Sequence, residues 1–209
     1  QLEKTKFYTD NKNTLDQDKG AGWWIWKPYY ILKTLKSATN GDYVIYSDCG
    51  DMFSPGLVNY LEQTLDKDDI SLLLLGNNKN GQYTKRDCFI KMGCDDSDYH
   101  NANQLEAGFM IWKVCDESIK VVEEWLEFCL DLDIVNNAPS TLGDELSGFV
   151  GHYNDQSILT NLAVREGLTV GGQDYRNFIE CDYDYWYERK SAGYGREIDK
   201  FLIQIKQNA

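Results

Sequence analysis

Hydrophobic positions recur along the chain with two periods, one typical of helices and one typical of strands. Helical spacing of apolar residues is found in four segments, residues 23–38, 56–65, 118–130 and 155–167. Short apolar runs typical of strands occupy residues 43–46, 70–75, 109–112 and 168–170. The polar stretches 1–22 and 136–148 carry turn signals and predict loops. Helices that alternate with strands predict an α/β fold, here a single domain over residues 1–209.

The run at residues 70–75 is apolar nearly throughout, which is typical of a strand buried on both faces of a parallel sheet. Ligands of open α/β sheets bind beyond the carboxyl ends of the strands. Polar residues that directly follow the predicted strands are therefore the first candidates for a functional site.

Composition narrows the chemistry that the chain can perform. Lys and Arg number 21 against 34 Asp and Glu, a net charge of −13, which argues against a nucleic-acid partner. A hydrophobic share of 42% with 13% aromatics is too high for a disordered chain. Only His100 and His152 are present, so an all-histidine zinc site is excluded. Carboxylates, a few cations and aromatic rings must carry the function.

The six cysteines form no CxxC pair and sit mostly in apolar contexts, which favours reduced, buried thiols over a disulfide framework. A signal peptide is not visible, and no apolar run is long enough to predict a transmembrane segment. The simplest location is cytoplasmic. Because the chain begins with Gln1, we expect a fragment or a processed product.

The first candidate site follows the strand at residues 43–46 and contains Asp48 and Asp51. A carboxylate at this position can hold a hard divalent cation through oxygen ligands, and the cation can neutralise a diphosphate. The alternative is an ordinary turn, because Asp and Gly commonly end strands.

The second candidate is the segment 20–28, where three tryptophans accompany a Gly-rich loop. Trp23 and Trp26 suit stacking on a base or a sugar ring, and Lys27 suits contact with phosphate. The alternative is a packed helix start with a lysine that extends to solvent.

Three further segments contain charged or polar residues that are candidates for a functional role. Lys85 and Arg86 are adjacent cations that suit a phosphate or acceptor contact, or else a solvated turn. Glu106 precedes a strand and suits a general base for a hydroxyl, or one half of a surface ion pair. Asp155 opens a helical segment and suits an N-cap. His152 can bind metal or phosphate, although a lone histidine usually does neither.

Read together, these segments resemble a family of small GT-A-type sugar transferases from bacterial and viral polysaccharide gene sets. They keep the order and approximate spacing of the family over residues 15–170. The resemblance rests on Gly22-Trp23-Trp24-Ile25-Trp26-Lys27-Pro28-Tyr29, on Gly41-Asp42 through Tyr46-Ser47-Asp48-Cys49-Gly50, on Thr84-Lys85-Arg86-Asp87, on Gln104-Leu105-Glu106-Ala107-Gly108-Phe109 and on Asp155-Gln156-Ser157-Ile158.

The resemblance implies a GT-A-like, Rossmann-like mixed sheet flanked by helices. It implies a nucleotide-sugar donor such as a UDP- or GDP-sugar, a Mn²⁺ or Mg²⁺ ion, and a glycan or glycoconjugate acceptor. The family's DxD motif reads Asp48-Cys49-Gly50 here, so its second carboxylate is missing, and Asp51, one residue later, either substitutes for it or points away. The first strand-helix-strand unit of the family has no clear counterpart before Phe7.

The implied roles fall into three groups. Metal binding is expected of Asp48 and Asp51. Catalysis is expected of Glu106 or Asp155, which activates the acceptor hydroxyl or orients the sugar. Donor binding is expected of Trp23, Trp26, Lys27, Asp48, Lys85 and Arg86.

Two other classes of function remain open at this point. A non-catalytic carbohydrate-binding domain would keep the fold without the complete metal site. A nucleotide-sugar hydrolase or a pyrophosphorylase would also use metal and diphosphate, although the chain lacks a Gly-rich nucleotidyl loop.

Overall fold

A computed structural model describes residues 2–48, 51–53, 56–65, 67–168, 170–174, 179–181 and 202–205. The helices are η1 (Leu2–Lys4), α1 (Lys6–Asp10), α2 (Lys12–Leu15), α3 (Gly20–Trp23), α4 (Trp26–Ser37), α5 (Gly56–Thr64), α6 (Asn80–Tyr83), α7 (Arg86–Lys91), α8 (Ser97–Asn101), α9 (Asp116–Cys129), α10 (Leu132–Val135) and α11 (Asp155–Arg165). The strands are β1 (Tyr43–Ser47), β2 (Asp51–Phe53), β3 (Ile70–Lys79), β4 (Asn103–Lys113), β5 (Val170–Asp174), β6 (Ile179–Cys181) and β7 (Leu202–Ile205).

The main sheet has the strand order β5-β3-β4-β1-β7 and is antiparallel at its centre. Strand β4 runs antiparallel to both of its neighbours, β1 and β3, and β1 is also antiparallel to β7. The pair of β3 and β5 is parallel. The predicted α/β class is confirmed, and the sheet combines parallel and antiparallel pairs, but its antiparallel centre is not the parallel sheet of a Rossmann-like fold. The apolar run of β3 reports burial on both faces, and burial does not fix the direction of the neighbouring strands.

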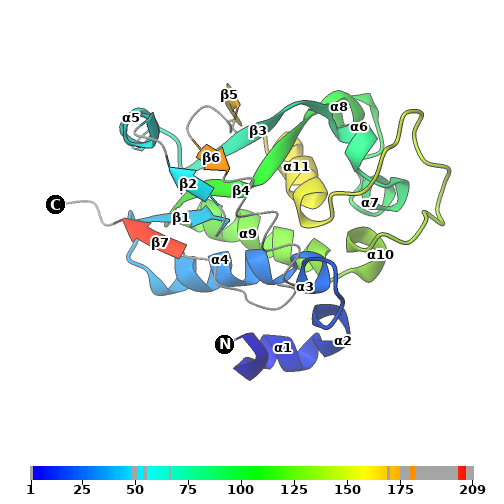
Figure 1. Ribbon diagram of the computed structural model, residues 1–209, viewed down its shortest axis with the longest axis horizontal. Coiled ribbons are helices and arrows are strands. Elements are labelled where there is room, and N and C mark those ends of the chain that lie inside the picture. The colour runs from blue at the N-terminus through cyan, green and yellow to red at the C-terminus, as the bar shows by residue number, and fades with distance from the viewer. Residues whose placement is uncertain are drawn as a thin grey trace.

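Helices cover both faces of the sheet (Figure 1). Alternate residues of β1 point to opposite faces, as the two-residue period of a strand requires. Val44 and Tyr46 belong to the larger core, which contains the apolar faces of α4, α9 and α11. Tyr43 and Ile45 belong to a smaller core under α5, which contributes Tyr60. The sheet therefore separates two apolar layers of unequal size.

Most predicted elements are found within a few residues of their expected bounds, and the N-terminal part differs most. The predicted loop 1–22 contains the short helices α1 and α2. Helix α4 begins at Trp26 instead of residue 23, because residues 20–24 all have positive φ angles. Of the segment 83–87, only Thr84 and Lys85 lie between α6 and α7, and both are buried, so the alternative of a solvated turn is wrong. The predicted strand 168–170 overlaps β5, and Thr169 lies outside the described residues.

The prediction of reduced thiols is confirmed where the structure describes the side chains. Cys88, Cys94, Cys115 and Cys129 are free, and three of these four are buried. Cys49 and the side chain of Cys181 lie outside the described residues. Over the described part of the chain, no helix combines the length and the apolar character needed to cross a bilayer.

Candidate functional site

A β-bulge in β4 organises the candidate site. The register of β3 against β4 pairs Leu72 with Met110 but pairs the next residue, Leu73, with Glu106. Residues 107–109 of β4 are therefore extra residues in the pairing with β3. Bulges re-aim side chains and release backbone groups from the ladder, and they are over-represented beside active sites.

Side chains from two helices bind the backbone of the bulge. The carbonyl oxygen of Ala107 accepts a hydrogen bond of 2.9 Å from Nζ of Lys27, in the first turn of α4. The Ala107 N–H donates to Oε1 of Gln156, in the first turn of α11, over 3.1 Å. Buried backbone groups need such partners once they leave the ladder. The bulge thus draws the N-terminal ends of α4 and α11 to the same point.

Two carboxylates lie beside Gly108 in the same bulge. The Gly108 N–H donates to Oε1 of Glu106 over 2.8 Å, and the Gly108 carbonyl oxygen accepts from the backbone N–H of Asp48 over 2.7 Å. A Cβ atom at position 108 would lie 2.8 Å from Oε1 of Glu106 and 3.6 Å from Cγ of Asp48. The missing side chain of Gly108 therefore leaves room for both carboxylates. Tyr46 Oη donates to Oδ1 of Asp48 over 2.7 Å and orients it.

A buried ion pair completes the cluster. Nζ of Lys27 lies 3.0 Å from Oδ2 of Asp155, and the two side chains are only 5% and 3% exposed. Burial lowers the pKa of Lys27, but attraction by Asp155, Asp48 and Glu106 outweighs burial, so the pKa of Lys27 is raised. The ammonium is therefore held in its charged form amid three carboxylates. Its Nζ also lies 5.4 Å from the centre of the Tyr46 ring.

Two strained backbone segments flank this ion pair. Residues 20–24 form a left-handed turn just before α4, with Ala21, Trp23 and Trp24 at φ angles of 48°, 52° and 60°. Each such residue costs about 1–2 kcal/mol relative to the right-handed form. Asn154, which directly precedes Asp155, is fully buried at φ 53° and ψ −118°. Strain of this kind clusters at functional sites, where the surrounding structure holds it in place.

The structure places the two tryptophans predicted to bind the donor, Trp23 and Trp26, in different surroundings. Trp26 is 3% exposed, and its Nε1 donates over 2.8 Å to the carbonyl oxygen of Gly20. Its position supports a packing role that fixes the left-handed turn. Trp23 is half-buried at the edge of the larger core, and the structure does not place it against the carboxylates.

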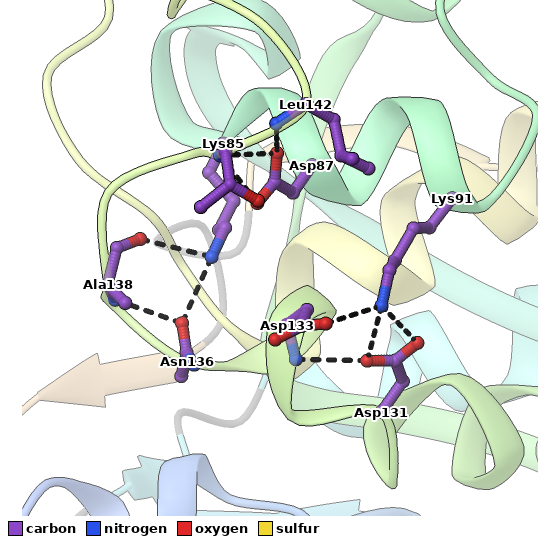
Figure 2. Close-up of polar contacts among 9 residues, drawn as sticks. Lys85, Asp87, Lys91, Asp131, Asp133, Asn136, Ala138 and Leu142 are labelled. Carbon is purple, nitrogen blue, oxygen red and sulfur yellow. Dashed lines mark hydrogen bonds and ion pairs between the residues drawn. The ribbon is translucent and has the colours of Figure 1, made fainter.

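Lys85 and Arg86 lie in a different neighbourhood, at the start of α7. Nζ of Lys85 donates to Oδ1 of Asn136 and to the carbonyl oxygen of Ala138, both over 3.0 Å (Figure 2). Arg86 forms an ion pair with Asp95 at 2.8 Å. Both cations bind protein groups away from the bulge, and their predicted contact with the donor stays a prediction.

Near α11, the structure corrects one predicted role and supports another. Asn154, and not Asp155, is the N-cap residue, because Asp155 is already helical and its carboxylate meets Lys27. His152 is buried, accepts the Lys85 N–H at Nδ1 and lies 2.8 Å from the carbonyl oxygen of Ile134 through Nε2. Burial lowers the pKa of His152 to about 3, so the ring is neutral. These contacts support a structural role for His152.

Asp48 is a described carboxylate that could hold a divalent cation, and Glu106 lies on the other side of Gly108. Among the described residues, no three His, Cys, Asp or Glu side chains are arranged so that they could hold a metal ion together. The backbone of Asp51 opens β2, but its side chain lies outside the described residues. Magnesium is commonly held by one or two carboxylates together with substrate phosphates, so Asp48 fits a cation that arrives with a diphosphate.

Sequence reasoning missed three residues that shape the site, namely Tyr46, Asn154 and Gln156. Tyr46 and Gln156 both belong to segments that carry the resemblance, but neither was assigned a role. The contact of Gln156 with the bulge depends on an irregular register that has no sequence signal. Comparison with protein families, with curated protein sequences and with solved structures gives no match to this chain.

Proposed function

We propose that the chain is a metal-dependent glycosyltransferase that moves a sugar from a nucleotide-sugar donor to a hydroxyl of a glycan. The observation that carries the proposal is the convergence of Lys27, Asp48, Glu106 and Asp155 on one β-bulge. These residues come from segments far apart in the chain, and the resemblance to GT-A-type transferases rests on the same segments.

Asp48 is the residue that would hold the cation, and its orientation by Tyr46 supports that role. When bound, a Mn²⁺ or Mg²⁺ ion neutralises the diphosphate that leaves with the nucleotide. A half-buried carboxylate such as Asp48 reaches both the protein interior and the solvent side, where a diphosphate would approach.

Glu106 is the proposed general base. Its carboxylate is held by the Gly108 N–H and is half-buried, so it can accept the proton of an acceptor hydroxyl. Asp155 is the weaker candidate, because it is buried against Lys27. Lys27 and Asp155 are positioning residues that hold the bulge, and with it the two working carboxylates.

Variants at the two carboxylates test this division of roles. Asp48→Asn should lower metal-dependent transfer by about 10²–10³-fold, as expected when a stabilising charge at the leaving group is lost. Glu106→Gln keeps an oxygen for the Gly108 N–H, so it should retain donor binding but lower transfer by about 10²–10⁴-fold. Glu117→Gln, on the exposed start of α9, is the matched control.

The outcomes separate the proposal from the other classes. Transfer activity that Asp48→Asn leaves unchanged would overturn the metal assignment. Glycan binding without any response to nucleotide sugar would favour a carbohydrate-binding domain. Release of free sugar, or of sugar phosphate, from the donor without transfer would identify a hydrolase or a pyrophosphorylase.

A further inference from the structure

A pocket of about 420 Å³ lies beside the long loop that connects α10 to α11. Its volume falls within the range of about 300–1,000 Å³ that is typical of small-ligand sites. Side chains that can recognise a ligand line it, namely Lys85, Asn137, Ser140, Asp144, Glu145 and Phe149.

The pocket wall is fixed by buried polar contacts (Figure 2). Lys85 is 2% exposed, and its ammonium holds the loop through Asn136 and Ala138. The carboxylate of Asp87, also buried, accepts the backbone N–H groups of residues 141 and 142 over 2.8–2.9 Å. The hydrogen bonds of Lys85 and Asp87 fix the loop at two points, and they thereby fix this wall of the pocket.

The polar groups that line the pocket suit a ligand with many hydroxyl groups. The carboxylates of Asp144 and Glu145 disfavour a free anion, and the Lys85 ammonium offsets one of these two negative charges. A hydroxyl group can donate to the carboxylate of Asp144 or Glu145 and can accept from an N–H donor, so it suits this lining. Phe149 adds an apolar surface for the face of a sugar ring.

The pocket is joined to the β-bulge site by a short chain of contacts. Oδ1 of Asn137, which lines the pocket, accepts a hydrogen bond of 3.0 Å from Nδ2 of Asn154. Asn154 is the strained, buried residue that directly precedes Asp155. The same Asn137 oxygen also accepts from Nζ of Lys19, over 3.0 Å.

We propose that this pocket is an acceptor subsite that binds one neutral monosaccharide unit of the glycan. The unit lies beyond the sugar that receives the transferred residue. The role of the pocket as an acceptor subsite rests on the proposed glycosyltransferase function. The class of ligand rests on the residues that line the pocket.

Kinetics with the intact chain test the acceptor role. The double variant Asp144→Asn/Phe149→Ala removes one charged acceptor and the apolar wall. Loss of about 1.4 kcal/mol of binding should raise the KM for the acceptor glycan about tenfold. The KM for the donor and the slow hydrolysis of the donor by water should stay unchanged. Leu142→Ala, on the same loop but outside the pocket lining and 52% exposed, is the matched control. An unchanged acceptor KM in the double variant would overturn the inference.

A binding experiment without nucleotide keeps the inference testable if transfer is never observed. A panel of neutral methyl glycosides should shift the NMR signals of Ser140 and Gly143, which line the pocket, and the double variant should abolish those shifts. Shifts confined to other parts of the chain would overturn the inference, as would stronger binding of inorganic phosphate at this pocket. Failure of transfer together with glycoside binding at the pocket would refute the proposed function alone.

Discussion

The Lys27–Asp155 ion pair gives the sharpest prediction about how the site is held together. Lys27→Met leaves Asp155 buried without its cation and also removes the attraction felt by Asp48 and Glu106. Removing one partner of a buried pair costs about 3–5 kcal/mol. We therefore expect Lys27→Met to lower the free energy of unfolding by about 4 kcal/mol. Asp155→Asn should cost less, because Lys27 keeps two carboxylates nearby.

The double variant Lys27→Met/Asp155→Asn measures how strongly the two charges stabilise each other. Once both charges are gone, the cost should fall short of the sum of the single costs by about 1–3 kcal/mol. Equilibrium unfolding in urea at pH 7 measures all three values and the wild type. Costs that add within about 0.5 kcal/mol would refute the coupling. The double variant should recover stability without recovering transfer, because Nζ of Lys27 no longer binds the bulge at Ala107.

Three further predictions concern single positions. Gly108→Ala places a methyl group 2.8 Å from Oε1 of Glu106. The transfer rate should fall about tenfold or more, while the free energy of unfolding should change by only about 1–3 kcal/mol. A wild-type transfer rate in this variant would contradict the prediction. In Gly22→Ala the new Cβ atom would lie 2.6 Å from a backbone oxygen, whereas in Gly93→Ala, also at positive φ, it would meet nothing within 4 Å. Urea unfolding should therefore show a larger loss of unfolding free energy for Gly22→Ala than for Gly93→Ala. Equal losses would refute the steric reason. Because the pKa of His152 is lowered to about 3 from an unfolded value of about 6.5, the unfolded chain binds the extra proton between these values. Its contribution to stability should therefore decline as pH falls from about 6.5 towards 3, by up to about 1.4 kcal/mol per pH unit, and His152→Gln should flatten that part of the profile; an unaltered slope would contradict the assignment.

The helices and strands were largely predictable because their apolar spacing is local. The run at 70–75 and the helical spacing at 118–130 correspond to β3 and α9. Strand direction was not predictable in this way. An apolar run records that both faces are buried, and helices on both sides of an antiparallel centre bury it as completely as they would in a parallel sheet.

Part of the candidate site was predicted as a set of residues, but its geometry was not predicted. Lys27, Asp48, Glu106 and Asp155 were all candidates, and the structure brings them together. The β-bulge that assembles them depends on an irregular pairing between β3 and β4, which leaves no periodic trace. The same limit explains Lys85, whose contacts are set by a loop more than 50 residues away in the chain.

Calorimetric titration with nucleotide sugars, with and without Mn²⁺, tests the proposed transferase most directly. We expect the wild-type chain to bind a UDP- or GDP-sugar only when the metal is present. The same titration of Asp48→Asn should show no response to the metal. Donor binding that ignores Mn²⁺, or an Asp48→Asn chain that keeps the full metal response, would contradict the proposal that Asp48 holds a divalent cation for a nucleotide-sugar donor.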